Sequence, residues 1–161
     1  MKAKIIITIE LIVKKIQNVK NKFRSSCPMA SALDIIGDKW SLLIIRDMLL
    51  GHKKTFKEIS DSEEAIAPSI LSARLKLLES FELITKRKLP ENLKENIYLL
   101  TEKGIALAPM LIEIILFADK NFRQFNPKML PISDKGFNLD KSIVIQNIQN
   151  GYRELVQNTI S

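Results

Sequence analysis

The stretch TFKEISDSEEAIAPSILSARLKLLESF, residues 55–81, decides the fold. Thr55 and Glu58 have the T-x-x-E spacing of a capping box, which opens a short helix, and the polar residues SDSEEA end that helix. Pro68 suits the first turn of a second, stronger helix. Three leucines recur in this helix at helical spacing and form one apolar row: Leu71, Leu75 and Leu78. The stretch therefore predicts two helices joined by a turn.

The opposite face of the second helix carries small and polar side chains. Four of them follow the spacing i, i+3, i+4 and i+7: Ser69, Ser72, Ala73 and Lys76. Such a face fits a helix-turn-helix, because the helix can then approach base edges in the major groove of DNA closely. The serines can hydrogen-bond to bases or phosphates, Ala73 can contact a thymine methyl group, and Lys76 or Arg74 can reach a purine or the backbone.

Two further helices are predicted before this stretch. Residues 28–36 form a short helix that begins at Pro28, and Gly37 suits its end. Asp38 then caps a very apolar helix, KWSLLIIRDMLL, which Gly51 terminates. Trp40 is expected to anchor this helix in the core.

A β-hairpin is predicted after the second helix of the quoted stretch. Its strands are ELITKRKL, residues 82–89, and IYLL, residues 97–100, and a turn around PENLKEN, residues 90–96, joins them. We expect phosphate contacts from basic residues on the hairpin and just before the capped helix: Lys86, Arg87 and Lys88 on the first strand, Lys94 at the tip, and Lys53 and Lys54 before the helix. Any one of these residues could equally be an ordinary solvent-exposed charge, so the prediction depends on their lying together on one face.

The remainder of the chain is predicted to be helical. Residues 101–122 form a helix with an inward apolar face: Leu107, Leu111, Ile114, Ile115, Phe117 and Ala118. Residues 124–140 contain two prolines and a glycine and predict a linker. A last helix, residues 141–158, has apolar residues on one side: Ile145, Ile148, Tyr152 and Leu155. The expected fold class is mainly α with a small β-hairpin.

The N-terminal arm, residues 1–24, holds most of the net charge. It carries seven of the 25 basic residues and one of the 18 acidic residues, so +6 of the net +7 lies there. Apolar residues recur in the arm at spacings of four and three: Ile5, Ile9, Ile12, Ile16, Val19 and Phe23. This seam favours a helix over the strand that the β-branched run IIITI would also allow. Such a helix needs a partner, either its own domain or the same helix of a second subunit.

The composition excludes several classes of protein. One cysteine, Cys27, and one histidine, His52, rule out an internal disulfide and a zinc site of the Cys/His type. Neither residue lies in a nucleophile motif, and the five scattered glycines form no nucleotide-binding loop, so we expect no enzyme, no metal and no cofactor. The run IIITIELIV is too short to span a bilayer, so we expect no stable membrane insertion, and a single thiol fits the cytoplasm.

A series of short motifs runs through residues 27–122. In chain order these are Cys27-Pro28-Met29, Ala32-Leu33-Asp34-Ile35-Ile36-Gly37, Lys39-Trp40, Leu49-Leu50-Gly51, Phe56, Ile66-Ala67-Pro68, Leu71-Ser72-Ala73-Arg74-Leu75-Lys76, Leu83-Ile84, Tyr98, Leu100-Thr101-Glu102-Lys103-Gly104 and Ala108-Pro109. The series resembles the HxlR-type winged helix-turn-helix transcriptional regulators, relatives of the MarR group.

The resemblance implies a dimer that binds an inverted-repeat operator in double-stranded DNA. Pro68–Ser80 would be the recognition helix and residues 86–99 the wing, and Thr55 and Pro68, which open the two helices, join the expected DNA-binding set. The chain would then consist of an arm (residues 1–24) for dimerisation, a winged-helix domain (residues 25–123), and a linker with a C-terminal helix (residues 124–161).

Cys27 lies just before the first helix of this resemblance. Some members of the family use a cysteine there to sense oxidants or electrophiles, so the resemblance leaves two roles open: a sensor for such an effector, or an unreactive thiol packed at the dimer interface. For the whole chain we expect a sequence-specific DNA-binding transcriptional regulator. The alternative is a winged-helix module that binds protein without reading DNA sequence.

Overall fold

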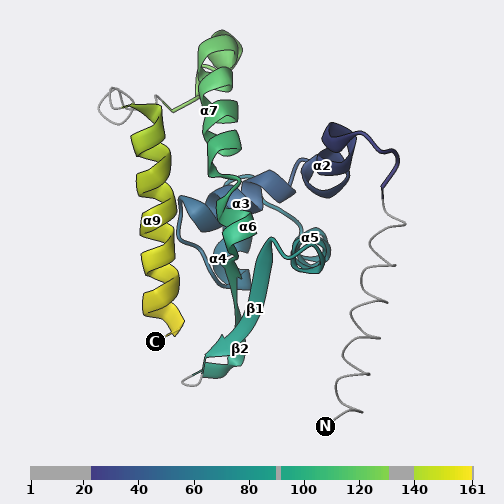
Figure 1. Ribbon diagram of the computed structural model, residues 1–161, viewed down its shortest axis with the longest axis vertical. Coiled ribbons are helices and arrows are strands. Elements are labelled where there is room, and N and C mark those ends of the chain that lie inside the picture. Colours follow the sequence, from purple (N-terminus) through teal and green to yellow (C-terminus); the bar gives the residue numbers. More distant parts are fainter. Residues whose placement is uncertain (1–22, 90–91, 131–139, 161) are drawn as a thin grey trace.

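The computed structural model describes residues 23–89, 92–130 and 140–160 (Figure 1). The elements in chain order are α2 (Pro28–Ile36), α3 (Ser41–Leu49), α4 (Phe56–Ser60), α5 (Pro68–Ser80), β1 (Ile84–Leu89), β2 (Asn92–Leu100), α6 (Glu102–Ile105), α7 (Ala108–Phe122), the 3₁₀ turn η1 (Arg123–Phe125) and α9 (Lys141–Ile160). The predicted class, mainly α with a β-hairpin wing beside a helix-turn-helix, is confirmed. The apolar seam of the arm lies outside the described residues, except for Phe23.

The predicted capping box at the start of α4 is confirmed. The N–H of Thr55 donates to Glu58 Oε2 at 2.8 Å, and the N–H of Glu58 donates to Thr55 Oγ1 at 3.2 Å. The N–H of Lys54 also donates to the Glu58 carboxylate, at 2.9 Å. These backbone hydrogen bonds hold the pKa of Glu58 below its ordinary value, and the bond from Lys54 has the largest effect.

Helix α3 begins two residues later than the sequence predicts, at Ser41. Asp38 still caps it, because Asp38 Oδ1 accepts from the N–H of Trp40 at 2.9 Å and from that of Ser41 at 3.1 Å. At the other end, Gly51 leaves no room for a side chain, since a Cβ there would lie 2.7 Å from the carbonyl oxygen of Asp47. Helices often end with a residue in the left-handed backbone conformation, and after α3 this residue is His52, with φ 55°.

The core lies between α3, α5, the root of the hairpin and α7. Its fully buried side chains come from each of these elements and from α9, which supplies Tyr152. The predicted leucine row of α5 is buried in this core, and Trp40 packs against its edge. The predicted C-terminal helix is present as α9, and its apolar side faces the core as expected.

The two strands pair antiparallel, and their register runs from Ile84 opposite Leu100 to Leu89 opposite Asn92. The predicted turn around residues 90–96 is therefore wrong, because residues 92–96 belong to β2, and Lys94 lies within that strand rather than at the tip. Of residues 92–96 the register pairs Asn92, opposite Leu89, and it shifts between Arg87 and Leu89. The side chains of residues 92–96 stay mostly in solvent. Apolar and polar residues do not alternate in this stretch, so its sequence predicts a turn rather than a strand.

The helix predicted over residues 101–122 is divided in two, and of the six residues of its expected apolar face only Leu111 is buried. Helix α6 ends at Ile105 and α7 begins at Ala108, with Pro109 in its first turn. Leu111 is buried, but Ile114 is 46% exposed and Phe117 is 59% exposed. The end of α7 extends beyond the core (Figure 1), so within one chain these side chains face solvent.

Candidate nucleic-acid interface

Helix α5 presents one exposed face, and the predicted reading residues lie on it. Ser69, Ala73 and Lys76 are exposed and Ser72 is half-buried, while the leucine row on the opposite side is fixed in the core. Pro68 occupies the first turn and is also exposed. The face is therefore small, polar and held on a rigid helix, which lets a ligand surface approach the backbone closely.

Arg74 does not belong to that exposed face. Its Nε lies 3.3 Å from Asp38 Oδ1, with both side chains half-buried, so it ties α5 to the turn between α2 and α3. Burial alone would raise the pKa of Asp38. The hydrogen bond from the Ser41 hydroxyl, the N–H of Trp40 and the charge of Arg74 outweigh burial and lower it. Arg74 therefore fixes the orientation of α5 through its ion pair with Asp38.

Lys53 is likewise committed to a partner inside the protein. Its Nζ lies 3.0 Å from Oδ2 of the buried Asp47. Arg46 reaches the same carboxylate with Nη2 at 2.6 Å and Glu64 with Nη1 at 2.7 Å, and these hydrogen bonds raise the pKa of Arg46. The cluster joins the end of α3 to the segment between α4 and α5. This cluster holds the segment that leads into α5, and no pattern in the sequence indicated the cluster.

The segment between α4 and α5 also contains a strained residue. Ala65 has φ 52°, in the left-handed region that alanine rarely adopts. The neighbouring Ile66 is buried and Glu64 pairs with Arg46, so the turn is held from both sides. Thr55 contributes by capping α4, and the N–H and carbonyl of Lys54 are bonded to Glu58 and Tyr98, which leaves its ammonium group as the part available for a ligand.

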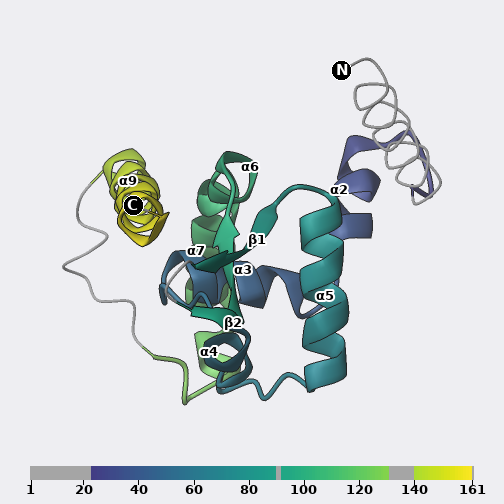
Figure 2. The same cartoon turned by 90° about the horizontal axis from the view of Figure 1, so that it is seen from below.

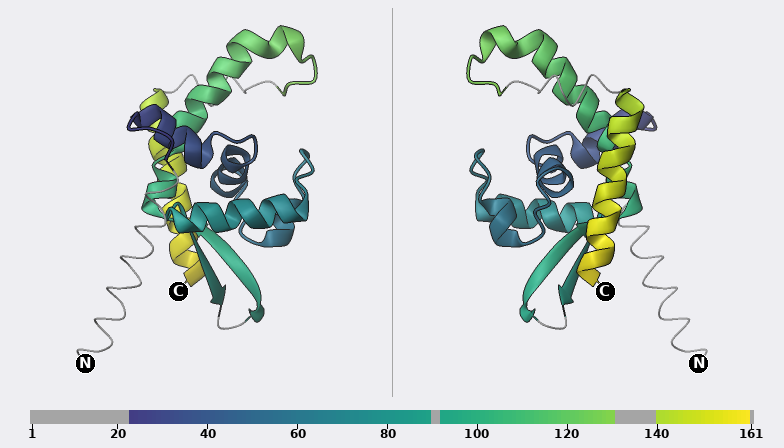
Figure 3. Two further views of the ribbon diagram at one scale, coloured as in Figure 1. Left: turned by 90° about the vertical axis from the view of Figure 1, so that its right-hand side faces the viewer. Right: turned by 90° about the vertical axis from the view of Figure 1, so that its left-hand side faces the viewer.

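The hairpin carries four further basic residues of the predicted set that are exposed. Lys86, Arg87, Lys88 and Lys94 all lie in solvent along the outer part of the two strands. In Figure 3 this outer part projects from the same side of the molecule along which α5 lies, away from the free end of α7. The hairpin and α5 therefore lie on one side of the molecule, while the joint role of their exposed residues in binding DNA stays a prediction.

Arg87 lies apart from Lys86 on the hairpin. Adjacent residues of a strand point to opposite faces. Arg87 donates from Nε to Thr85 Oγ1 at 3.3 Å, and both residues line a hollow of about 390 Å³ toward α9, together with Glu102 and Arg153. Arg87 and Lys86 therefore point to different faces of the hairpin.

Cys27 is exposed and forms no disulfide. It occupies the N-cap position of α2, where its N–H donates to Ser25 Oγ at 3.2 Å and its carbonyl accepts from Ser31. The thiol is therefore accessible to reagents in solution. Over the described ranges there is no group of His, Cys, Asp and Glu side chains that could hold a metal ion.

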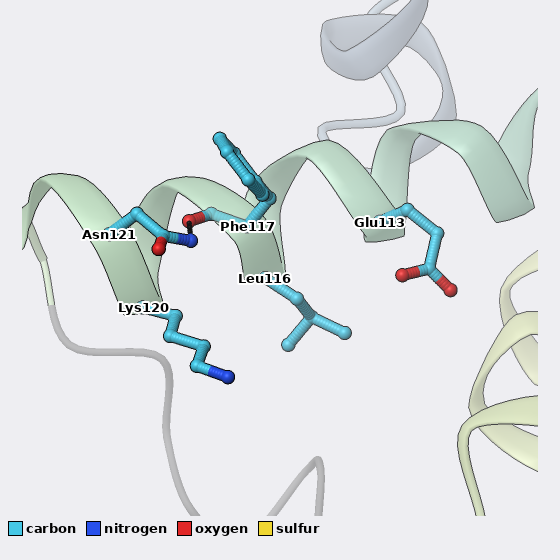
Figure 4. A pocket seen from close by; sticks show the side chains of 5 residues that line it. All are labelled: Glu113, Leu116, Phe117, Lys120 and Asn121. Carbon is cyan, nitrogen blue, oxygen red and sulfur yellow. Dashed lines mark hydrogen bonds between the residues drawn. The ribbon is translucent and has the colours of Figure 1, made fainter.

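The free part of α7 offers a hollow of about 390 Å³ that a single helix lines (Figure 4). Leu116 and Lys120 point to one side of the helix there, and Phe117 points to the other. Phe117 packs edge-to-face on Phe122, with ring centroids 5.5 Å apart. A site bounded by one helix does not enclose a small ligand, so this region is a surface rather than a cavity. Within residues 23–89, 92–130 and 140–160, no helix has the length and apolar character to cross a membrane.

The geometry agrees with comparisons to known proteins. A family model described as HxlR-like helix-turn-helix matches residues 35–126. The HTH-type transcriptional regulator YodB of Bacillus subtilis is 41% identical over 95 residues, which are 58% of this chain and 84% of YodB. The structure of reduced YodB superposes with a TM-score of 0.52 at 37% identity and covers 65% of this chain and all of that chain. The redox regulator HypR in its oxidised form superposes with a TM-score of 0.53 at 26% identity, over 59% of this chain and 97% of that chain.

Proposed function

The chain belongs to the HxlR-like helix-turn-helix family of transcriptional regulators, and on that premise we propose that it reads an inverted-repeat operator as a homodimer. Helix α5 enters the major groove and the β1–β2 hairpin lies along the phosphate backbone. The observation that carries the proposal is the exposed, small-residue face of α5 beside a basic hairpin on the same side of the molecule (Figure 3).

The reading residues are those of the α5 face. Ser69 and Ser72 hydrogen-bond to bases or phosphates, Ala73 contacts a thymine methyl group, and Lys76 reaches a purine or a phosphate. Lys54 and the hairpin residues Lys86, Arg87, Lys88 and Lys94 neutralise phosphates. Lys53 and Arg74 act indirectly, because their ion pairs with Asp47 and Asp38 hold the helices in place.

The second subunit covers the exposed apolar face of α7. Ile114, Phe117 and Phe122 form a patch that a monomer would leave in water, and an isologous contact between two copies would bury it twice. A two-fold axis through this contact presents two α5 helices to successive major grooves, about 34 Å apart. The apolar seam of residues 1–24 adds to the same contact in this proposal.

Cys27 is the group that would make binding respond to oxidants. It is the one cysteine of the chain, it is exposed, and it lies directly before α2. A peroxide converts the thiol to a sulfenic acid and leaves as water or alcohol, and a second Cys27 thiol then displaces water to form a disulfide between subunits. The similarity to a redox regulator, HypR, supports this reading.

Selection of fragments from the organism's genomic DNA tests the proposed function. We expect enrichment of an inverted repeat that the protein binds more tightly than random DNA at about 150 mM salt, typically by a factor of about 1,000 or more. Repeating the selection with peroxide should change the enrichment in the wild type and leave Cys27→Ser unaffected. Equal affinity for selected and random DNA would refute specific readout and favour a protein-binding module.

A further inference from the structure

Helix α9 lies outside the segment that the family model matches, which ends at residue 126. It nevertheless supplies the largest fully buried side chain of the described residues, Tyr152. Figures 1 and 2 show the hairpin between α5 on one side and α9 on the other. The inward side of α9 packs on the core through Ile145, Ile148, Leu155 and Val156.

Tyr152 completes the hydrogen bonding of the free edge of β2. One edge of β2 pairs with β1. On the other edge the N–H of Tyr98 donates to the carbonyl of Lys54 at 2.7 Å, and Thr55 forms an isolated bridge with Ile97. The amide of Leu100 points to this same edge, because alternate amides of a strand share a direction. The segment before α4 does not extend along this edge as far as Leu100. There the hydroxyl oxygen of Tyr152 accepts the hydrogen bond from Leu100 N, at 3.0 Å.

This hydrogen bond is sealed from water. Leu100 is 2% exposed and Tyr152 is 0% exposed, so water cannot replace the hydroxyl if it is removed. Burial raises the pKa of Tyr152, so the hydroxyl stays neutral near physiological pH. Two further bonds tie α9 to α6, which follows β2: Gln149 Nε2 to the carbonyl of Ile105 at 3.2 Å, and Arg153 to the Glu102 carboxylate at 2.9 Å.

The root of β2 determines where the outer hairpin points. A two-stranded hairpin is marginally stable by itself, so its direction depends on how its root is held. Lys94 lies six positions before Leu100 in β2, which is roughly 20 Å at the ordinary rise of a strand. A tilt at Leu100 is therefore amplified at Lys94 and at the other exposed lysines of the outer hairpin.

We propose that Tyr152 is a positioning residue for the wing: its hydroxyl, carried by a helix beyond the family segment, accepts the edge amide of Leu100 and so aims the basic hairpin at the DNA backbone. The proposal rests on the proposed function, in which the hairpin contacts phosphates. It assigns α9 a part in DNA binding that acts through the direction of the wing.

The test is Tyr152→Phe in the full-length protein, with Tyr98→Phe as the matched control. Both changes remove a hydroxyl near the same sheet, but Tyr98→Phe leaves the acceptor of Leu100 N intact. On a selected operator, Tyr152→Phe should weaken binding by about 3-fold to 10-fold and flatten the dependence of log K on log salt by about 0.9 for each phosphate that the wing no longer neutralises. The order of preference among base-pair variants should stay unchanged, and the Leu100 amide should exchange its hydrogen faster. Ile148→Ala, which loosens α9 at another point, should flatten the salt dependence in the same direction.

An unchanged salt dependence in Tyr152→Phe, with a lower melting temperature alone, would overturn the proposal and leave α9 as a stabilising helix. A wild type that fails to prefer the operator would instead overturn the proposed function, and the positioning role with it. The two failures are distinguishable because the first requires normal specific binding by the wild type.

Discussion

Arg74 and Lys76 are two residues apart on α5 and have different surroundings. Lys76 is exposed on the reading face, whereas Arg74 is half-buried against Asp38. The same contrast separates Lys53, which pairs with Asp47, from the exposed lysines of the hairpin. At the scale of single residues, a positive charge in this region is thus either exposed and available to DNA, as Lys76 is, or paired inside the protein, as Arg74 and Lys53 are.

Paired substitutions at these two positions separate the roles. Lys76→Ala should flatten the salt dependence of operator binding by about 0.9 for each half-site and leave the melting temperature unchanged. Arg74→Ala should lower the free energy of unfolding by up to about 1 kcal/mol, since the ion pair is partly exposed, and leave the salt dependence unchanged. Filter binding across a salt series and thermal unfolding report the two effects. A flattened salt dependence in Arg74→Ala would place its guanidinium on DNA after all.

At the scale of elements, the capping box of α4 fixes the start of the helix-turn-helix. Thr55 and Glu58 satisfy three backbone N–H groups between them, and Thr55 also bridges to Ile97 of β2. The first helix of the motif and the wing are thus joined at one residue. Loss of the cap should therefore loosen both.

Thr55→Ala should lower the free energy of unfolding by about 1 kcal/mol, the usual cost of losing such a cap. The pKa of Glu58 is lowered in the folded protein, so its contribution is present above the ordinary carboxylate pKa and is lost as the pH falls through the lowered value. Between about pH 5 and pH 3, wild-type stability should therefore fall more steeply than that of Glu58→Gln. Urea unfolding at several pH values measures this, and parallel slopes would exclude Glu58 as a source of the pH dependence.

Elements with local signals were predictable from sequence, and those that depend on distant partners were not. Pro28, Thr55 and Pro68 mark helix starts through their own backbone chemistry, and α2, α4 and α5 begin where these residues predict. The outer part of β2 is exposed on both faces, so no apolar alternation distinguishes it from a turn. The partners of Lys53 and Arg74, the strained Ala65 and the Tyr152–Leu100 hydrogen bond arise only when separate segments fold together.

At the scale of the whole molecule, the surface proposed to contact DNA and the surface proposed to form the dimer are separate. The α5 face and the hairpin lie on one side, and the exposed apolar residues of α7 lie toward the opposite end (Figure 3). The sequence predicted an apolar face on α7, but amphipathicity does not reveal whether the same chain or a second copy covers it. Since +6 of the net +7 lies in residues 1–24, the surface proposed to contact DNA depends on where its charges lie more than on their number.

Phe117→Glu should dissociate the proposed dimer, because it places a charge in the apolar contact proposed for α7. We expect sedimentation of the variant as a monomer at micromolar concentration, together with weaker binding to the full inverted repeat. Lys120→Glu introduces the same side chain on another side of α7 (Figure 4) and should remain dimeric. Dimers of unchanged stability in Phe117→Glu would remove α7 from the interface.

The most direct test of the account is the affinity of Ala73→Glu for the selected operator and for random DNA at about 150 mM salt. A glutamate at the centre of the α5 face would meet base edges and phosphates, so the account predicts that the preference for the operator disappears while the protein keeps its fold. Ala106→Glu, at an exposed alanine between α6 and α7, should retain full preference. Retention of the wild-type preference by Ala73→Glu would contradict the reading of DNA by α5.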